Sequence, residues 1–138
     1  MQDAKIMQLF EFTGTTVHCY TENDVRTIGI GDDDFSPTNF VIISRLDEDE
    51  DEDLHHPVDK NIGIQTNFSN FESEAAITAI SLKENKLLIT IKPEKIRELG
   101  AGQICISLNV NSAALRELAR YLHLIFDEAN LDIFIDIR

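Results

Sequence analysis

Seven consecutive carboxylates at residues 47–53 are the feature that most constrains how this chain can fold. A protein core cannot hold them, because each charge would lose its hydration without gaining a partner. Apolar runs at residues 40–43 and 62–64 flank them and are typical of strands. We therefore expect a solvated acidic loop at about residues 46–60, which contains Asp47, Glu48, Asp49, Glu50, Asp51, Glu52 and Asp53.

The rest of the composition indicates one domain. The chain has 138 residues, 43% of them apolar, which is enough for one core in a single domain spanning residues 1–138. The two cysteines, Cys19 and Cys105, are far apart and lack metal-ligand spacing, so we expect both to be reduced. The first residues do not resemble a signal peptide, and no apolar run approaches the roughly 20 residues of a membrane span. These features predict a soluble, cytoplasmic protein.

The negative charge is concentrated in one region of the chain. The net charge is −13, and residues 22–59 hold 13 of the 25 acids but only two cations, Arg26 and Arg45. Such a field repels nucleic acid and anionic lipid, and it speeds the encounter with a basic protein. We therefore expect a basic protein partner, and neither nucleic acid nor a membrane.

The pattern of apolar residues predicts an α+β fold. A short helix at residues 93–100 has proline in its first turn and Gly100 at its end, and a longer amphipathic helix covers residues 113–127. We expect a mainly antiparallel sheet with one long and one short helix packed on one face. Alternation and β-branched residues predict its strands at residues 7–12, 15–20, 25–30, 40–46, 61–68, 76–82, 86–91, 103–110 and 131–137.

No residue pattern indicates catalysis or a cofactor. His55 and His56 adjoin the acidic residues, but adjacent side chains on an extended chain point to opposite sides, so they seldom ligate one metal ion. The same geometry separates Cys19 from His18, and Cys105 lies between two isoleucines. Glycine-rich phosphate loops and the common hydrolase motifs are absent from the sequence. We expect no enzyme activity, no cofactor and no metal site.

The candidate binding residues are therefore the acids themselves. In addition to residues 47–53, a second acidic group, Asp32, Asp33 and Asp34, follows the predicted third strand. An acidic surface of this kind can occupy the basic groove of a protein that binds or cuts nucleic acid, where it stands in for phosphates.

Several segments carry a resemblance to a known family. Thr27-Ile28-Gly29-Ile30 is followed by the acids at residues 32–34 and by residues 35–40. An apolar run then ends at Arg45, just before the acidic residues 47–53. The similarity continues at residues 87–91, 96–100 and 125–126. From about residue 10 to residue 126, the chain resembles the tenth immunity-protein family of bacterial polymorphic toxin systems. The resemblance implies a cytoplasmic antidote without turnover, which binds a cognate secreted toxin domain; a basic nuclease is the natural target.

Two other readings stay open. Small acidic α+β chaperones for secreted effectors have similar size and charge, although they usually begin with an amphipathic helix where this chain has a predicted strand. An enzyme or metal protein of unknown type would require a bound ion at His55 or His56. The chaperone hypothesis can be separated from the immunity hypothesis by measuring the size of the protein in solution and testing whether it binds unfolded effector segments.

Overall fold

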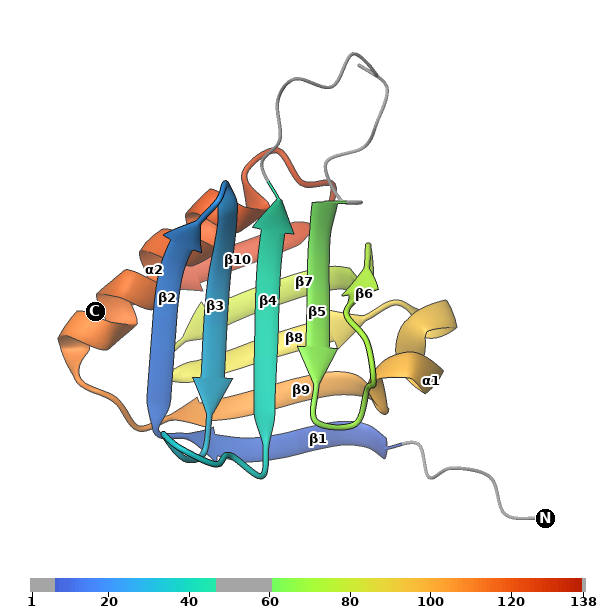
Figure 1. Cartoon of the computed structure of the whole chain (residues 1–138), viewed down its shortest axis with the longest axis horizontal. Helices are drawn as coiled ribbons and strands as arrows, with labels where there is room; N and C mark the ends of the chain where they lie inside the picture. The colour runs from blue at the N-terminus through green and yellow to red at the C-terminus, as the bar shows by residue number, and fades with distance from the viewer. Residues whose placement is uncertain (1–6, 47–60, 138) are drawn as a thin grey trace.

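The structure is a computed structural model, and it describes residues 7–46 and 61–137. Two five-stranded sheets lie face to face with their strands crossing, and a long helix lies beside them (Figure 1). The predicted α+β class is confirmed, since the strands are mostly antiparallel and the described residues contain one short and one long helix. The structure adds that the strands are divided between two sheets and that the helices lie at opposite ends of the molecule (Figure 1).

The front sheet in Figure 1 is antiparallel throughout, with the strand order β2-β3-β4-β5-β6. Its strand β4 is central, as expected of a segment that is apolar on both faces. No strand was predicted between residues 68 and 76, but this segment includes the two-residue strand β6. The strands are β2 (Thr16–Glu22), β3 (Val25–Gly31), β4 (Phe40–Leu46), β5 (Ile62–Thr66) and β6 (Ser73–Glu74).

The back sheet has the order β1-β9-β8-β7-β10. Its inner pairs are antiparallel, whereas the edge strands β1 and β10 pair in parallel with β9 and β7. The strand β10 lies at the edge of this sheet, and Asp132 and Asp136 at its two ends discourage association through this edge. The strands are β1 (Met7–Gly14), β7 (Ile77–Lys83), β8 (Lys86–Ile91), β9 (Ala101–Leu108) and β10 (Asp132–Asp136).

The core lies between the two sheets and is built from cross-strand rows of apolar side chains. In the back sheet the register aligns Phe10, Ile104, Ile89 and Ile80, all of which are buried. In the front sheet it aligns Ile28, Ile43 and Ile64, which are fully buried. Burying one such side chain stabilises a fold by roughly 1.5–3 kcal/mol, so these rows fix which face of each strand points inward.

The long helix α2 (Ser112–Phe126) packs against β2 and β3. Asn111 caps it by accepting a hydrogen bond from the amide of Ala114 at 2.8 Å. Its buried face includes Leu118, Leu122 and Ile125, which follow the three-four spacing seen in the sequence. The hydroxyl of Tyr121 lies 2.9 Å from that of Thr21 and ties the helix to β2.

The short helix α1 (Ile96–Leu99) follows the 3₁₀ turn η2 (Pro93–Lys95). It ends at Gly100, whose φ of +86° suits glycine and confirms the predicted helix end. The carbonyl of Leu99 accepts a hydrogen bond from the buried hydroxyl of Thr66 at 3.1 Å. This bond attaches the helix to β5 of the front sheet.

Arg45 joins the front sheet to the end of α2. It lies on the inner face of β4, with 8% of its surface exposed. Its Nη1 atom donates to the carbonyl oxygens of Ile125 at 2.9 Å and Asp127 at 2.7 Å. The last carbonyls of a helix have no partner within the helix and form the negative end of its dipole, so a buried cation is well placed there.

Candidate functional site

No described element covers the outer face of the front sheet. The back sheet and α2 lie behind this sheet in Figure 1, and the face turned toward the viewer carries no described layer. Side chains alternate along each strand, so β2 directs His18 and the half-exposed Tyr20 outward and β4 directs Phe40 and Ile42 outward. An uncovered sheet face with aromatic and aliphatic side chains is a candidate protein-binding surface.

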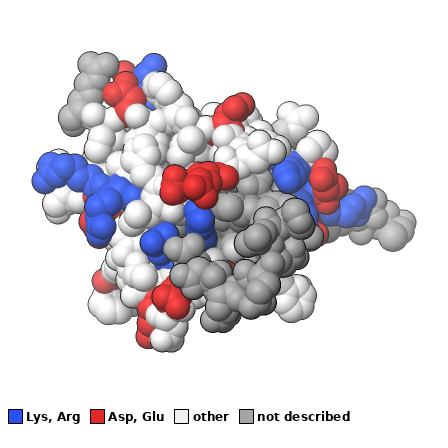
Figure 2. Space-filling model, turned by 90° about the horizontal axis from the view of Figure 1, so that it is seen from above, with Lys and Arg blue, Asp and Glu red and all other residues white. Residues whose placement is uncertain are grey.

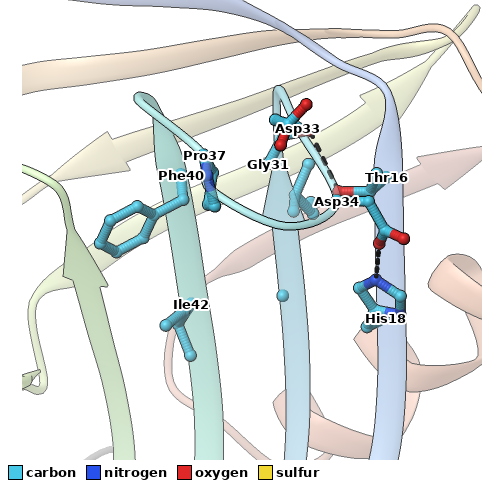
Figure 3. Close-up of a pocket in the computed structure, with 10 residues that line it drawn as sticks. Thr16, His18, Gly31, Asp33, Asp34, Pro37, Phe40 and Ile42 are labelled. Carbon is cyan, nitrogen blue, oxygen red and sulfur yellow. Dashed lines mark hydrogen bonds and ion pairs between the residues drawn. The ribbon is translucent and has the colours of Figure 1, made fainter.

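Two glycines create a hollow in this face, which we call the glycine trough. The register places Gly31 between Thr16 and Phe40, and it places Gly29 between His18 and Ile42. Both rows therefore lack a side chain at their centre, and a hollow of about 260 Å³ results. In Figure 3, His18 lies on the β2 side of the trough, while Phe40 and Ile42 lie on the β4 side.

The trough is closed at one end and open along the rest of β3. A Cβ atom added to Gly31 would lie 3.2 Å from the Cβ of Pro37 and 3.4 Å from the carbonyl oxygen of Asp33, so the loop between β3 and β4 closes over that end. A Cβ atom on Gly29 would lie no closer than 3.9 Å to its nearest neighbour, the carbonyl oxygen of His18. There is therefore room for a side chain above Gly29.

The loop at residues 32–39 is held by its own carboxylates. Asp32 accepts hydrogen bonds from the amides of Thr38 at 2.9 Å and Asn39 at 3.1 Å. Asp33 accepts from the amides of Phe35 at 3.0 Å and Ser36 at 2.8 Å. Aspartate commonly closes turns in this way, and these bonds give the loop a defined conformation.

The loop presents an aromatic ring beside negative charge. The side chain of Phe35 is 93% exposed. Next to it, Asp34 Oδ1 lies 2.9 Å from His18 Nε2, and both side chains are more than half exposed (Figure 3). A phenylalanine as exposed as this one gains little from the fold of its own chain, but a partner protein can bury it.

The acids predicted from the sequence to bind a partner fall into two groups, of which the structure describes one. Asp32 and Asp33 bond to their own loop, and Asp34 pairs with His18, so these three carboxylates shape the surface as well as charging it. Residues 47–53 lie outside the described residues, as do His55 and His56. Their predicted roles stay predictions.

The two cysteines are free thiols in half-buried positions. Cys19 and His18 point to opposite faces of β2, because His18 faces the trough and Cys19 packs against the core. Burial, with a smaller contribution from Glu117, raises the pKa of the Cys19 thiol to about 12. The thiol is therefore protonated at neutral pH, which does not suit a nucleophile.

A second hollow lies where α2 ends. It is lined by Arg26, Arg45, Arg120 and His123 among others, which makes it basic in an otherwise acidic protein. From this end of the molecule, basic and acidic side chains are interspersed over the described surface (Figure 2). Arg120 also forms a bidentate pair with Glu117, at 3.2 and 2.9 Å. The described part of this end therefore carries mixed charge.

Metal-binding and membrane-spanning features are not found in the described part of the chain. Across residues 7–46 and 61–137, no three histidine, cysteine or acidic side chains gather closely enough to hold a metal ion. Neither described helix combines the length and the apolar character that crossing a bilayer requires.

Neither protein-family models nor the sequences of curated proteins match this chain. The resemblance to an immunity-protein family therefore stays a prediction.

The trough and Phe35 were not predicted from the sequence. Gly29 and Gly31 are two residues apart in a strand, so they share one face, and this spacing was the available signal for a hollow. Phe35 follows three acids in a loop, where a large apolar side chain has no core to enter. Only the pairing of β2, β3 and β4 shows that these residues belong to one surface.

We expect the loop at residues 32–39 to lose its conformation on acidification. Backbone hydrogen bonds from Ser36 and, second, Phe35 lower the pKa of Asp33 below its ordinary value. The stability that this carboxylate gives to the loop is therefore fully present above the ordinary aspartate pKa of about 3.9. It is lost as the pH falls through the lowered pKa. Amide NMR shifts of Phe35 and Ser36 should report this transition.

Asp33→Ala should shift the same two amides at neutral pH, whereas Asp132→Ala, on the far sheet, should leave them unchanged. An inflection of the Ser36 amide at or above the ordinary aspartate pKa would contradict the expected direction.

Proposed function

We propose that this protein neutralises a basic protein partner by binding it, as an immunity protein neutralises a bacterial toxin, and that it has no turnover of its own. The observation that carries the proposal is the loop at residues 32–39. Its carboxylates hold it in one conformation, and it presents Phe35 with 93% of the side chain exposed beside an open sheet face. Aromatic anchors set in a defined surface are typical of residues that dominate binding energy.

The charge of the chain suits the same role. A net charge of −13 steers a cationic partner toward the protein and raises the association rate. Fast association matters for an antidote, because it has to bind the toxin before the toxin reaches its target. Within this proposal the partner is a secreted toxin domain, with a basic nuclease as the natural candidate, and the site of action is the cytoplasm.

The chaperone alternative gains no support from the described residues. We therefore propose the immunity function alone.

Phe35→Ala should weaken binding to the toxin at least about tenfold, which corresponds to about 1.4 kcal/mol. The test uses the full-length protein and the C-terminal domain of a secreted toxin encoded by the neighbouring gene, with affinity and association rate measured at several salt concentrations. Wild-type association should slow as the salt concentration rises, because charge steering is screened.

Phe134→Ala is the matched control. The side chain of Phe134 is also exposed, at 53%, but it lies on β10 at the edge of the other sheet. Its substitution should leave binding unchanged. Equal losses in the two variants, association that does not depend on salt, or the absence of an adjacent toxin gene would each contradict the proposal.

A further inference from the structure

We propose that the glycine trough receives an arginine side chain of the basic partner. This inference rests on the proposed function and adds to it the contact that a basic protein would make. It follows from the shape of the trough, the apolar character of its walls and the position of the acids at its rim.

The shape of the trough suits one long, unbranched side chain. The missing side chains of Gly29 and Gly31 lie in successive rows on one face of β3, so the hollow of about 260 Å³ runs along that strand. Ile42 and Pro37 provide apolar surface on the β4 side (Figure 3). Long cationic side chains commonly pack their methylene groups on such surface while their charged end stays in contact with water.

Negative charge lies at the closed end and on the β2 side of the trough. Asp34 pairs with His18 through Oδ1, so its other carboxylate oxygen, Oδ2, can accept a hydrogen bond from an incoming donor. The carbonyl oxygen of Asp33 lies 3.4 Å from the position of a Cβ atom on Gly31, so it borders the trough as a further acceptor. A side chain that enters along Gly29 would therefore place its tip among oxygen acceptors.

Arginine fits these acceptors better than lysine or an apolar side chain. A guanidinium group is planar and carries five donors, so it can bond to a carboxylate and a carbonyl oxygen together, whereas an ammonium acts as a compact point charge. An apolar side chain would fill the trough but would remove water from Asp34 Oδ2 without offering this atom a donor, which opposes binding. Several long side chains fit the shape of the trough, and the charge at its rim favours arginine among them.

The test is an NMR titration of the full chain with N-acetyl-arginine methylamide. We expect saturable shifts of the Gly29, Gly31 and Asp34 amides, with a dissociation constant on the order of 1 mM, as befits a ligand of this size. The citrulline analogue, which has nearly the same shape without the charge, should cause less than about a tenth of the shift at equal concentration. The lysine analogue should bind more weakly, and the leucine analogue should not bind.

Two variants locate the site. Gly29→Val should abolish the shifts by filling the trough, since the space above Gly29 is open and the backbone there accepts any residue. Asp34→Asn should reduce the affinity at least about threefold. The matched control, Asp132→Asn, removes an exposed acid from β10 on the other sheet and should change nothing.

The outcomes separate this inference from the proposed function. Equal binding of arginine and citrulline, preferred binding of leucine, an absence of shifts, or unchanged shifts in Gly29→Val would overturn the arginine site. If Phe35→Ala still weakened toxin binding in that case, the proposed function would stand without the trough. If the trough bound arginine but no toxin were bound, the proposed function would fail on its own.

Discussion

Arg45→Met is expected to lower the free energy of unfolding by about 3 kcal/mol, as measured by urea denaturation. Methionine retains much of the volume and apolar stem of arginine, so the loss isolates the guanidinium group. The carbonyl oxygens of Ile125 and Asp127, at 2.9 and 2.7 Å from Nη1, would lose their donor where the chain leaves α2. A buried acceptor without a donor costs more than the hydrogen bond contributes when it is present.

Arg116→Met is the control for this variant. Arg116 is exposed on the same helix, and its substitution should change the stability by no more than about 0.5 kcal/mol. Arg45→Lys should recover part of the loss, because an ammonium group can donate to the same carbonyl oxygens but lacks the fixed planar geometry of the guanidinium group. If Arg45→Met were as stable as wild type, the connection between β4 and α2 would contribute nothing and our account of this helix end would be wrong.

Gly14→Val is expected to destabilise the protein by about 2–3 kcal/mol, whereas the same substitution at Gly29 should leave stability unchanged or slightly raised. A Cβ atom on Gly14 would lie 2.7 Å from Ile30 Cγ2 and 2.9 Å from Ile106 Cγ2, so both isoleucines would have to move. Gly14 thus packs between Ile30 of the front sheet and Ile106 of the back sheet, where close-packed side chains have little space to rearrange.

The comparison between the two glycines controls for the change of residue itself. Both substitutions add the same atoms to a strand, so any general effect of replacing glycine by valine is common to them. Thermal and urea unfolding should therefore differ between the variants by about 2 kcal/mol or more. Equal stabilities would show that the sheets can separate at Gly14, and the described packing of Ile30 and Ile106 would then be incorrect.

A stable Gly29→Val protein also supports the arginine experiment. If this variant folds as well as wild type, a loss of arginine binding reports the filled trough and not an unfolded chain. The same protein can be tested against the toxin domain, where the size of its effect shows how much of the binding energy depends on the trough.

Most of the strands and both helices could be predicted from the sequence, because each of them carries a local signal. Alternation in β9 places Ile104 and Ile106 on one face, and the three-four spacing in α2 places Leu118 and Leu122 on another. Asn111 and Gly100 mark helix ends through hydrogen bonding and backbone conformation that depend only on neighbouring residues. Such signals act within a few residues, so no knowledge of the tertiary structure is needed.

The candidate site was predicted only in part. The acids at residues 32–34 were singled out by charge, but their hydrogen bonds to the loop and to His18 depend on how the chain turns between β3 and β4. The trough needed the register of three strands, because a glycine makes a hollow only if its cross-strand neighbours have side chains. Local pattern cannot supply that register.

The sequence by itself determined the fold class, the positions of most strands and of both helices, and the concentration of negative charge, because these follow from periodicity and composition. Only the tertiary structure decided that the strands form two crossed sheets, that Arg45 meets the end of α2, and that Gly29 and Gly31 open a hollow beside Asp34. These features join residues far apart in the chain or on different strands, and their geometry is set by packing that acts on the whole domain at once.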